Sequence, residues 1–319
     1  MNSIYFAYGR TALKYGLKNL KLTPGSQILI PGYICLVVCD AIKEINLKYI
    51  FYNINDNLEP DWEDINSKIK NNNISAIMVV HYFGMPQDVS KYKKIANEHN
   101  LYLIEDNAHG YLGRYDNGDL IGTQGDFSIT CPRKHLNLFS GGLLTINKNN
   151  SDNLNNLTKD LEYKKININY FKLRQKIKKI KLLHFAYSQF KKNKIIYNDP
   201  LLFREKKIKD NLIDIYSKEK ILNNDDNKMI ISRRKKYLYW QNYANNNNLK
   251  PLFDGISKYS NPWCFPVITQ SKNDRLDLLK IGLKQNLKIF TWPTLPIELV
   301  NKENNFLKIW NKILCFSTL

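Results

Sequence analysis

The sequence predicts an α/β protein with a doubly wound, mostly parallel large-domain sheet that carries helices on both faces. A smaller α+β C-terminal domain is expected to follow. Short runs rich in Ile, Val and Leu alternate with helical stretches up to about Asn147, and this alternation is typical of a parallel sheet. The runs are apolar throughout, as expected for strands buried on both faces. The rhythm stops after Asn147, where polar and charged segments begin.

Each element of the first half is predicted from its local pattern. Strands are expected where β-branched and apolar residues cluster, and helices where apolar residues recur at helical spacing. The Pro24-Gly25 turn ends the first helix. In chain order we expect a strand at 4–8, a helix at 11–20, a strand at 27–31, a helix at 35–45, a strand at 47–54, a helix at 63–72, a strand at 76–83, a helix at 89–99 and a strand at 101–106.

The second half predicts a different organisation. Residues 152–209 have a polar helical pattern, and residues 212–248 continue as charged helices. Residues 263–267 and 287–295 have the pattern of strands. The predicted division is therefore a large α/β domain at residues 1–150, a basic helical connecting region at 151–248 and a small α+β domain at 249–319.

The net charge of +19 is concentrated in one region, since residues 164–209 hold fifteen Lys or Arg and two acids. Such a run is typical of exposed helices with a solvated face. The alternative is attraction to an anionic sugar nucleotide or an anionic membrane surface. No zinc finger, RNP motif or helix-turn-helix pattern accompanies the charge, so no nucleic-acid partner is expected.

Composition further limits the class of protein. No run of about 18 apolar residues is present, so no integral membrane segment is expected. The N-terminal MNSIYFAYGR lacks the pattern of a signal peptide, which favours a cytoplasmic protein. The five cysteines are scattered without paired metal-ligand spacing, so we expect reduced thiols and no metal site.

Three side chains predict a cofactor site. Asp106 ends the apolar run LYLIED, His109 follows it, and Lys134 precedes a Gly-Gly pair. A carboxylate at the carboxyl end of a strand and a later lysine can hold pyridoxal 5′-phosphate (PLP), with the acid on the ring nitrogen and the amine in a Schiff base. His109 would bond a group beside the ring, or else cap a surface loop. For Glu105 we expect a structural role.

The cofactor phosphate has its own candidate residues. Gly9, Arg10 and Thr11 come where a strand meets a helix N-terminus, which favours anions, although an ordinary capped helix has the same pattern. The hydroxyls of Ser128 and Thr130 precede Lys134 and suit a phosphate-anchored aldehyde.

Two aromatic residues have open roles. Tyr33 could stack on the cofactor ring or pack in the core. Trp292 could lie near the substrate, although core packing is the simpler expectation.

Five segments in consistent order resemble one known family. These are YGRTALKYGLKNL, PGSQILIPGYICLVVCDAI, VVHYFGMPQDV, IEDNAHGYLG and CPRKHLNLFSGG. Together they are similar to the phosphate-binding helix start, the PGDEVIVP strand, H-x-x-G-x-P-x-D, EDxAxxxG and the lysine-to-Gly-Gly stretch of the DegT/DnrJ/StrS sugar aminotransferases. That resemblance runs from about Tyr8 to Asn147 and implies the aspartate-aminotransferase-like (type I) PLP fold.

The resemblance implies an activity and a set of roles. Members transfer an amino group, commonly from glutamate, to a nucleotide-linked keto-sugar, here expected in surface polysaccharide or O-antigen synthesis. They are usually homodimers. By position, Lys134 would form the Schiff base and then move the proton, Asp106 would pair with the ring nitrogen, and His109 would lie near the phenolic oxygen. Arg10, Thr11 and Ser128 fall near the phosphate.

Four departures from the family keep alternatives open. Eight residues precede Gly9, fewer than is usual, and the F-S-F-x-P-T-K spacing is stretched by one residue. A different placement of that residue would put Arg133 at the lysine position. Cys35 stands where an aromatic ring often stacks on PLP, which leaves Tyr33 as a substitute. The loop that members donate across the dimer is not recognisable, and Arg233, Arg234 and Asn242 are candidates for related work.

Two other functions compete with transamination. Related sugar dehydratases replace the lysine with histidine, and His135 is adjacent to Lys134. A degenerate, non-catalytic member that acts as a scaffold or partner would explain the short N-terminal segment and the stretched spacing.

Overall fold

A computed structural model gives the fold and describes residues 2–147, 151–169, 200–201, 209–285, 287–301 and 303–319. The elements of the first half are β1 (Asn2–Phe6), α1 (Gly9–Asn19), β2 (Gln27–Pro31), α2 (Leu36–Lys43), β3 (Lys48–Tyr52), α3 (Trp62–Asn71), β4 (Ile74–Val80), η1 (Tyr82–Gly84), α4 (Ser90–Glu98), β5 (Tyr102–Asn107), β6 (Phe127–Thr130), η2 (Pro132–Lys134) and β7 (Gly142–Ile146). The helices α1 to α4 and the strands β1 to β5 agree with the predicted ones to within a few residues at the ends, whereas β7 was not predicted.

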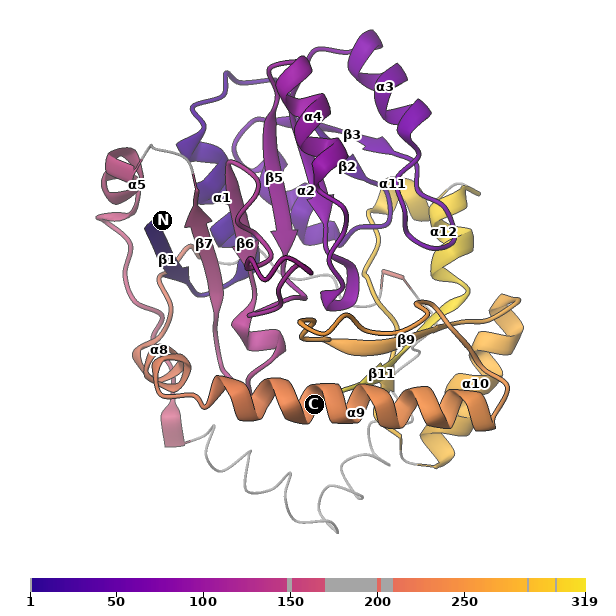
Figure 1. The fold of residues 1–319 in the computed structure, drawn as a ribbon. Coiled ribbons are helices and arrows are strands. Elements are labelled where there is room, and N and C mark those ends of the chain that lie inside the picture. Colours follow the sequence, from indigo (N-terminus) through magenta and orange to yellow (C-terminus); the bar gives the residue numbers. More distant parts are fainter. Residues whose placement is uncertain (1, 148–150, 170–199, 202–208, 286, 302) are drawn as a thin grey trace.

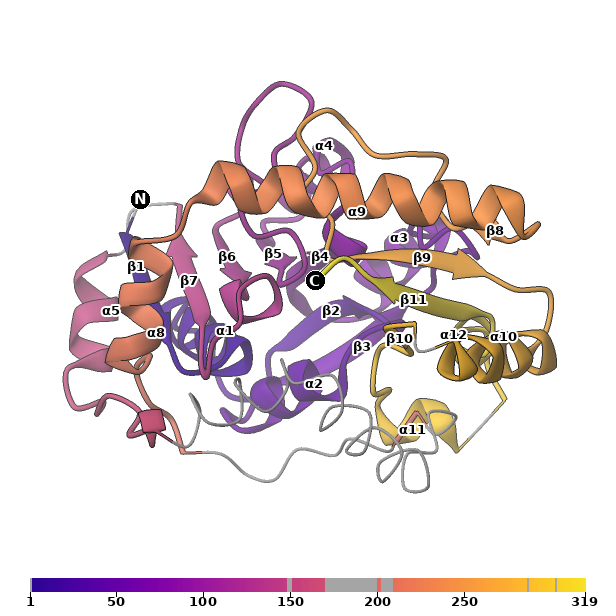
Figure 2. The ribbon, with the colours of Figure 1, turned by 90° about the horizontal axis from the view of Figure 1, so that it is seen from below.

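These strands form a seven-stranded sheet in the order β1-β7-β6-β5-β4-β2-β3 (Figure 1). The neighbours from β3 through β2, β4 and β5 to β6 are parallel, whereas β7 is antiparallel to both β6 and β1. Helices α1 and α2 cover one face of the sheet, and α3 and α4 cover the other (Figure 2). The predicted doubly wound, mostly parallel class is confirmed.

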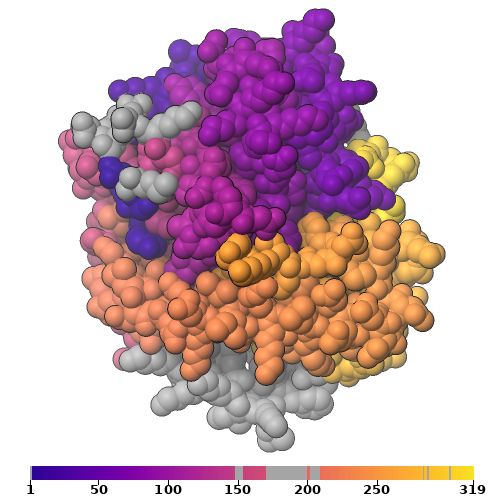
Figure 3. All heavy atoms as spheres, in the orientation of Figure 1, coloured from indigo at the N-terminus to yellow at the C-terminus, as the bar shows by residue number. Residues whose placement is uncertain are grey.

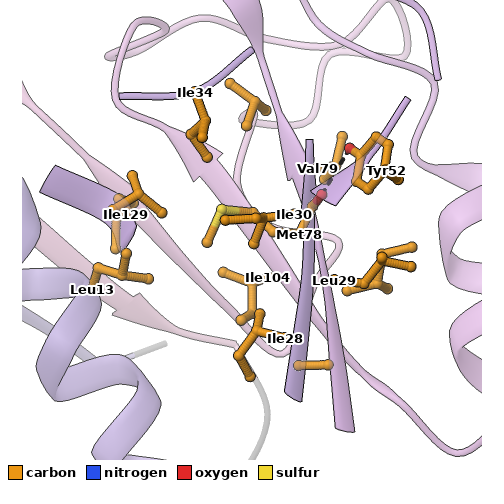
Figure 4. Packing of buried hydrophobic residues seen from close by; sticks show 14 of the residues in the cluster. Leu13, Ile28, Leu29, Ile30, Ile34, Tyr52, Met78, Val79, Ile104 and Ile129 are labelled. Carbon is orange, nitrogen blue, oxygen red and sulfur yellow. Dashed lines mark hydrogen bonds between the residues drawn. The ribbon is translucent and has the colours of Figure 1, made fainter. Parts of the chain in front are cut away.

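The central strands explain why this sheet forms. Strand β2 is fully buried at Ile28, Leu29 and Ile30, although successive side chains point to opposite faces of the sheet. The side chains of Met78 and Ile104 pack in the same cluster (Figure 4). An apolar run buried on both faces is stable only between two helical layers. The packing therefore fixes the carboxyl ends of β4, β5 and β6 at one edge, where open α/β sheets hold their ligands.

The second half builds a smaller sheet. Its elements are α5 (Ser151–Thr158), α8 (Ile215–Leu222), α9 (Asp226–Asn246), β8 (Lys250–Pro251), β9 (Cys264–Ile268), α10 (Lys272–Lys284), β10 (Ile289–Phe290), α11 (Ile297–Val300), α12 (Asn305–Trp310) and β11 (Ile313–Ser317). The four strands pair antiparallel in the order β10-β11-β9-β8. Helix α9 runs past the carboxyl edge of the large sheet and along the smaller one (Figures 1 and 2), and its side chains belong to the band below the first-half residues in Figure 3.

One expectation for the second half is wrong, and one strand was not predicted. The strand expected at 287–295 is limited to β10, because Pro293 cannot donate a ladder hydrogen bond and the chain turns away. Strand β11 pairs with both β9 and β10 and was not anticipated.

The helix expected at 152–209 is also shorter than expected in its described part. Residues 159–167 after α5 are not helical, and within them Tyr163 forms a β-bridge with Leu212, which also bridges to Phe6 of β1. Residues 170–199 and 202–208 of the basic region lie outside the described residues. The domain boundaries at residues 150 and 248 stay predictions. None of the helices described combines the length and apolar character needed to cross a bilayer.

Glu105 fixes the crossover from β5 to β6. This fully buried carboxylate accepts hydrogen bonds from the backbone N–H groups of Gln124 and Gly125 at 2.6 Å and of Gly122 at 3.1 Å. The Tyr115 hydroxyl donates at 2.6 Å, and His81 Nε2 lies 3.0 Å away. Burial alone would raise the pKa of Glu105, but bonds from His81, Tyr115 and Gly125 outweigh it and hold the pKa below its usual value. The structural role expected for Glu105 agrees with this network.

Glu105→Gln should lower the free energy of unfolding by about 2–4 kcal/mol near neutral pH, because buried donors lose a charged acceptor. A depressed pKa gives stability that is present above the unfolded value of about 4.3 and lost as the pH falls through the folded value. The gap between variant and wild type should therefore shrink in acid. Urea unfolding at several pH values measures it.

The control is Glu98→Gln, since the Glu98 side chain is exposed and 3.9 Å from Lys94. This change should stay within about 0.5 kcal/mol of wild type. Equal effects of the two substitutions would contradict the role of Glu105.

Candidate functional site

The carboxyl edge of the large sheet brings Asp106, His109 and Lys134 together with two tryptophans from the second half. Lys134 Nζ lies 5.0 Å from the ring centroid of Trp263 and 5.9 Å from that of Trp292. The His109 ring stacks on Trp263 at 4.2 Å and meets Trp292 edge-on at 4.4 Å. Lys134 and both tryptophans are partly exposed, whereas Asp106 and His109 are buried. The three predicted residues therefore share one partly open, aromatic-walled site.

Asp106 is a buried acid with few partners. Its Oδ1 accepts a hydrogen bond of 3.0 Å from the Ala108 N–H, and 7% of the residue is exposed. Burial raises the pKa of Asp106, while the Lys134 charge and the Ala108 bond oppose that rise. Lys134 is thus the main cation that favours the ionised form of this acid.

His109 offers an unused donor. Its Nδ1 accepts a 3.1 Å hydrogen bond from the Phe83 N–H, which puts the ring proton on Nε2. Nε2 is buried and has no hydrogen-bond partner among the residues described. Burial, together with the charges of Lys134 and His135, lowers the pKa of His109 well below its usual value, so the ring is neutral. A buried donor without a partner is costly, and a ligand acceptor would remove that cost.

Of three consecutive basic residues, only Lys134 faces Asp106 and the tryptophans. The Arg133 side chain is exposed, with its guanidinium 5.6 Å from the ring centroid of Tyr8. His135 is buried, and its Nε2 lies 2.9 Å from the carbonyl of His109. Burial is also the main reason why the pKa of His135 lies well below its usual value.

The N-terminus of α1 lacks a side-chain cap of the kind that α3 has. Asp61 caps α3 by accepting from two backbone N–H groups, whereas Tyr8 gives α1 no side-chain cap. Instead the Gly9 N–H donates to the thiol of Cys131, and a Cβ on Gly9 would lie 2.3 Å from that sulfur. The glycine thus permits a close approach of β6's continuation to α1. Lys164 adds charge here, because its Nζ donates to the Tyr8 hydroxyl and lies 4.1 Å from the ring centroid.

Two residues predicted to contact the phosphate, Arg10 and Thr11, lie in the first turn of α1, and their contact with a phosphate stays a prediction. Thr11 is buried in the first turn of α1, beside Gly9. Arg10 precedes it, and its charge lowers the pKa of Asp40 against the larger effect of burial.

The structure separates the other predicted hydroxyls from α1. Ser128 pairs with Glu105, and Ile129 pairs with Asp106. Because side chains alternate along a strand, Ser128 lies on the Glu105 face, with its Oγ 2.8 Å from where a Cβ of Gly122 would be. Thr130 pairs with Asn107 and, two residues after Ser128, lies on the same face of the sheet. The position expected for Ser128 near the cofactor phosphate is therefore not supported, because strand alternation turns its side chain to the Glu105 face.

Tyr33 is also kept from the site. It is fully buried, and its hydroxyl donates to the Trp292 carbonyl at 2.5 Å. Its ring packs against those of Tyr82 and Trp292. Of the two roles considered for Tyr33, core packing agrees with this environment.

Two residues of the site, Trp263 and Cys131, were not predicted from the sequence, and Arg233 was predicted only as a candidate for the work of the loop donated across a dimer. Trp263 and Arg233 come from the second half, and only tertiary packing brings them to Lys134. Cys131 could have been found by counting strand alternation from Asp106 across to β6. Arg233 lies buried in its own chain rather than at a surface that could face a partner.

His109→Phe should lower the free energy of unfolding by about 1–3 kcal/mol, because the ring can still stack on Trp263 but the Phe83 N–H loses its acceptor. Chemical denaturation measures the change. His99→Phe, at an exposed position after α4, should change stability by about 0.5 kcal/mol or less. A His109 variant as stable as the His99 variant would refute the hydrogen bond.

Asp106→Asn should raise the melting temperature of the protein without added ligand near pH 8. A folded pKa above the unfolded value means that the ionised acid costs stability, and this cost grows as the pH rises above about 3.9. The gain should disappear in acid. Asp254→Asn, at an exposed position, is the control and should give no gain. Loss of stability at pH 8 in the Asp106 variant would contradict the environment derived for this acid.

The sequence model of the DegT/DnrJ/EryC1/StrS aminotransferase family matches residues 2–167. GDP-perosamine synthase of Vibrio cholerae is 32% identical over 121 residues, which is 38% of this chain and 32% of that protein. GDP-perosamine synthase of Escherichia coli O157:H7 is 31% identical over 142 residues, 44% of this chain and 38% of that protein. The match thus spans about a third of the length of these relatives.

Solved structures match over the whole chain at low identity. The Helicobacter pylori aminotransferase PseC has a TM-score of 0.71 at 14% identity, covering 99% of this chain and 81% of that one. A Streptococcus pneumoniae protein described as a sugar aminotransferase, in its PLP form, has a TM-score of 0.68 at 13% identity, covering 99% and 81%. These likenesses establish the fold. On the family match over residues 2–167, this chain belongs to the DegT/DnrJ/EryC1/StrS aminotransferase family.

Proposed function

We propose that this protein is a PLP-dependent aminotransferase that moves an amino group onto a nucleotide-linked keto-sugar. The observation that carries the proposal is the convergence of the Lys134 amine, the buried Asp106 carboxyl and the unpartnered His109 Nε2 on one side of the sheet edge. An amine, an acid and a neutral donor are the three groups that a pyridoxal ring needs around it.

The residues present fit the cofactor. Lys134 would hold its aldehyde carbon, Asp106 its ring nitrogen, and His109 Nε2 its phenolic oxygen. The α1 N-terminus with Arg10 and Thr11 would hold its phosphate, since backbone N–H groups and the helix dipole favour an anion there. When bound, PLP withdraws electrons from the substrate carbon that carries the amine.

The chain's own side chains supply the proton chemistry. The positive charge of Lys134 favours the anionic form of Asp106, which can then keep a proton on a nitrogen beside it. The Ala108 N–H fixes the direction of that carboxylate. Lys134 Nζ is the base that moves a proton at the substrate carbon, and the rings of Trp263 and Trp292 lie beside it.

The substrate class is supported by the relatives. Two matching proteins are named GDP-perosamine synthase, and a third is a UDP-N-acetyl-3-dehydro-glucosamine 3-aminotransferase that is 27% identical over 143 residues. A nucleotide diphosphate is an anion, which agrees with the net charge of +19. Glutamate as donor, a role in surface polysaccharide synthesis, a homodimer and a cytoplasmic location complete the proposal.

The position of His135 supports transamination over the dehydratase alternative. Its ring is buried, with Nε2 next to the His109 carbonyl rather than facing Asp106. The scaffold alternative has one observation in its favour, because the Cys131 thiol already takes the Gly9 N–H at the expected phosphate end.

Borohydride reduction of the protein with PLP should fix one cofactor mass on the peptide that holds Lys134, and the unreduced protein should absorb visible light. Lys134→Ala should abolish both signals, because no other amine of the described chain lies beside Asp106. Lys94→Ala, at an exposed position, should leave both unchanged. Peptide mass spectrometry and absorbance measure the two signals.

The outcomes separate the three functions. Visible absorbance that glutamate bleaches supports transamination. Bound PLP that borohydride fixes on no lysine supports the dehydratase route. A wild-type protein that stays colourless in excess PLP overturns the proposal and supports the scaffold.

A further inference from the structure

Arg233 of α9 is a buried cation that no carboxylate of the described chain pairs with. Only 2% of the residue is exposed. Its Nη2 donates to the carbonyls of His135 at 2.6 Å and Lys134 at 3.3 Å. Its Nη1 donates to Thr318 Oγ1 at 2.9 Å and lies 3.4 Å and 3.5 Å from the carbonyls of Pro262 and Trp263.

Burying this charge among neutral acceptors is costly. Desolvation lowers the pKa of Arg233 to about 10, although the guanidinium donates to several carbonyl oxygens. A well-packed apolar side chain in such a place is often as stable or more so. The guanidinium therefore has a use that apolar packing would not serve.

Its acceptors belong to two walls of one site. The carbonyls of Lys134 and His135 are part of the backbone that carries the reactive amine. The carbonyls of Pro262 and Trp263 are part of the backbone that carries the ring lying 5.0 Å from that amine. The guanidinium of Arg233 thus joins the backbone at Lys134 and His135 to the backbone just before β9. These two segments are far apart in the sequence.

We propose that Arg233 is a positioning residue that sets the backbone of Lys134 against Trp263 and so directs the amine toward Asp106. The effect of Arg233 on PLP binding rests on the proposed function. Its effect on the direction of the Lys134 amine does not depend on that function. Arg233 touches neither the amine nor the acid, so it acts through the backbone of Lys134.

The geometry of arginine suits this task. A guanidinium holds its N–H groups in a rigid plane and reaches acceptors on both edges at once, whereas an ammonium is a single flexible donor centre. Arg233→Lys keeps the charge but cannot serve the carbonyls of His135 and Trp263 together. Reacting groups misplaced by about 1 Å lose on the order of a hundredfold in rate.

Arg234 is a matched control. It is the next residue of α9 and also bonds carbonyls, since its Nη1 donates to Ser257 at 2.7 Å and Ser260 at 3.0 Å. Neither acceptor belongs to the backbone of Lys134 or Trp263. Loss of the Arg234 bonds should affect the loop at 257–260 and leave the amine in place.

The experiment compares Arg233→Lys and Arg233→Met with Arg234→Lys and Arg234→Met. The full-length protein without cofactor is treated with a small amine-acetylating reagent, and peptide mass spectrometry follows Lys134 relative to exposed Lys94. Each variant is assayed the same interval below its own melting temperature, which removes a general loss of stability. The Arg233 variants should change the relative labelling rate of Lys134 by about fivefold or more, and the Arg234 variants by less than about twofold.

A second measurement uses PLP. Its dissociation from the Arg233 variants, followed by absorbance and by borohydride trapping on Lys134, should be about tenfold faster than from wild type or the Arg234 variants.

Equal effects at positions 233 and 234 overturn the proposal, as does unchanged labelling of Lys134 in both Arg233 variants. If Arg233→Met fails to fold by circular dichroism, Arg233→Lys decides. If wild-type protein binds no PLP, the proposed function fails, while the labelling comparison still judges Arg233.

Discussion

The site depends on two adjacent carboxyls at the end of β5 that face opposite sides of the sheet. Glu105 receives five hydrogen bonds on one side and has a lowered pKa, while Asp106 receives one on the other and has a raised pKa. Strand alternation forces this division, so the network that ties down the crossover also aims Asp106 at the opposite face. One acid stabilises the fold, and its neighbour is left available for chemistry.

The same region holds several polar groups that the fold itself does not satisfy. Among the described residues, His109 Nε2 has no hydrogen-bond partner and Arg233 has no carboxylate partner, and Asp106 is ionised only at a cost. Each of these groups costs free energy in a protein of otherwise well-packed strands. His109 Nε2 and Asp106 both lie near Lys134, and a polar ligand bound there would supply the partners that these two groups lack.

The sequence predicted what short-range pattern determines. Apolar runs between helices gave the parallel sheet, and a carboxylate at the end of such a run placed Asp106 at the ligand edge. Trp263 and Arg233 could not be found this way, because their contacts with Lys134 join residues far apart in sequence. The face taken by Ser128 was missed although alternation determines it. The strand expected at 287–295 failed because Pro293 interrupts pairing despite favourable neighbours.

Relative to the family motif, this chain has one more residue between Ser128 and Lys134. The aldehyde end and the phosphate end of a cofactor would be affected differently by that residue. Strand β6 ends at Thr130 and the η2 turn follows it, and the Lys134 amine lies 5.0 Å from the ring centroid of Trp263. The position five residues before that lysine, serine in the family motif, is here Ile129 on the Asp106 face. Cys131 then meets Gly9. The amine is thus retained while a β6 hydroxyl is lost from this face. An anion at the start of α1 would be held by backbone N–H groups and nearby cations instead.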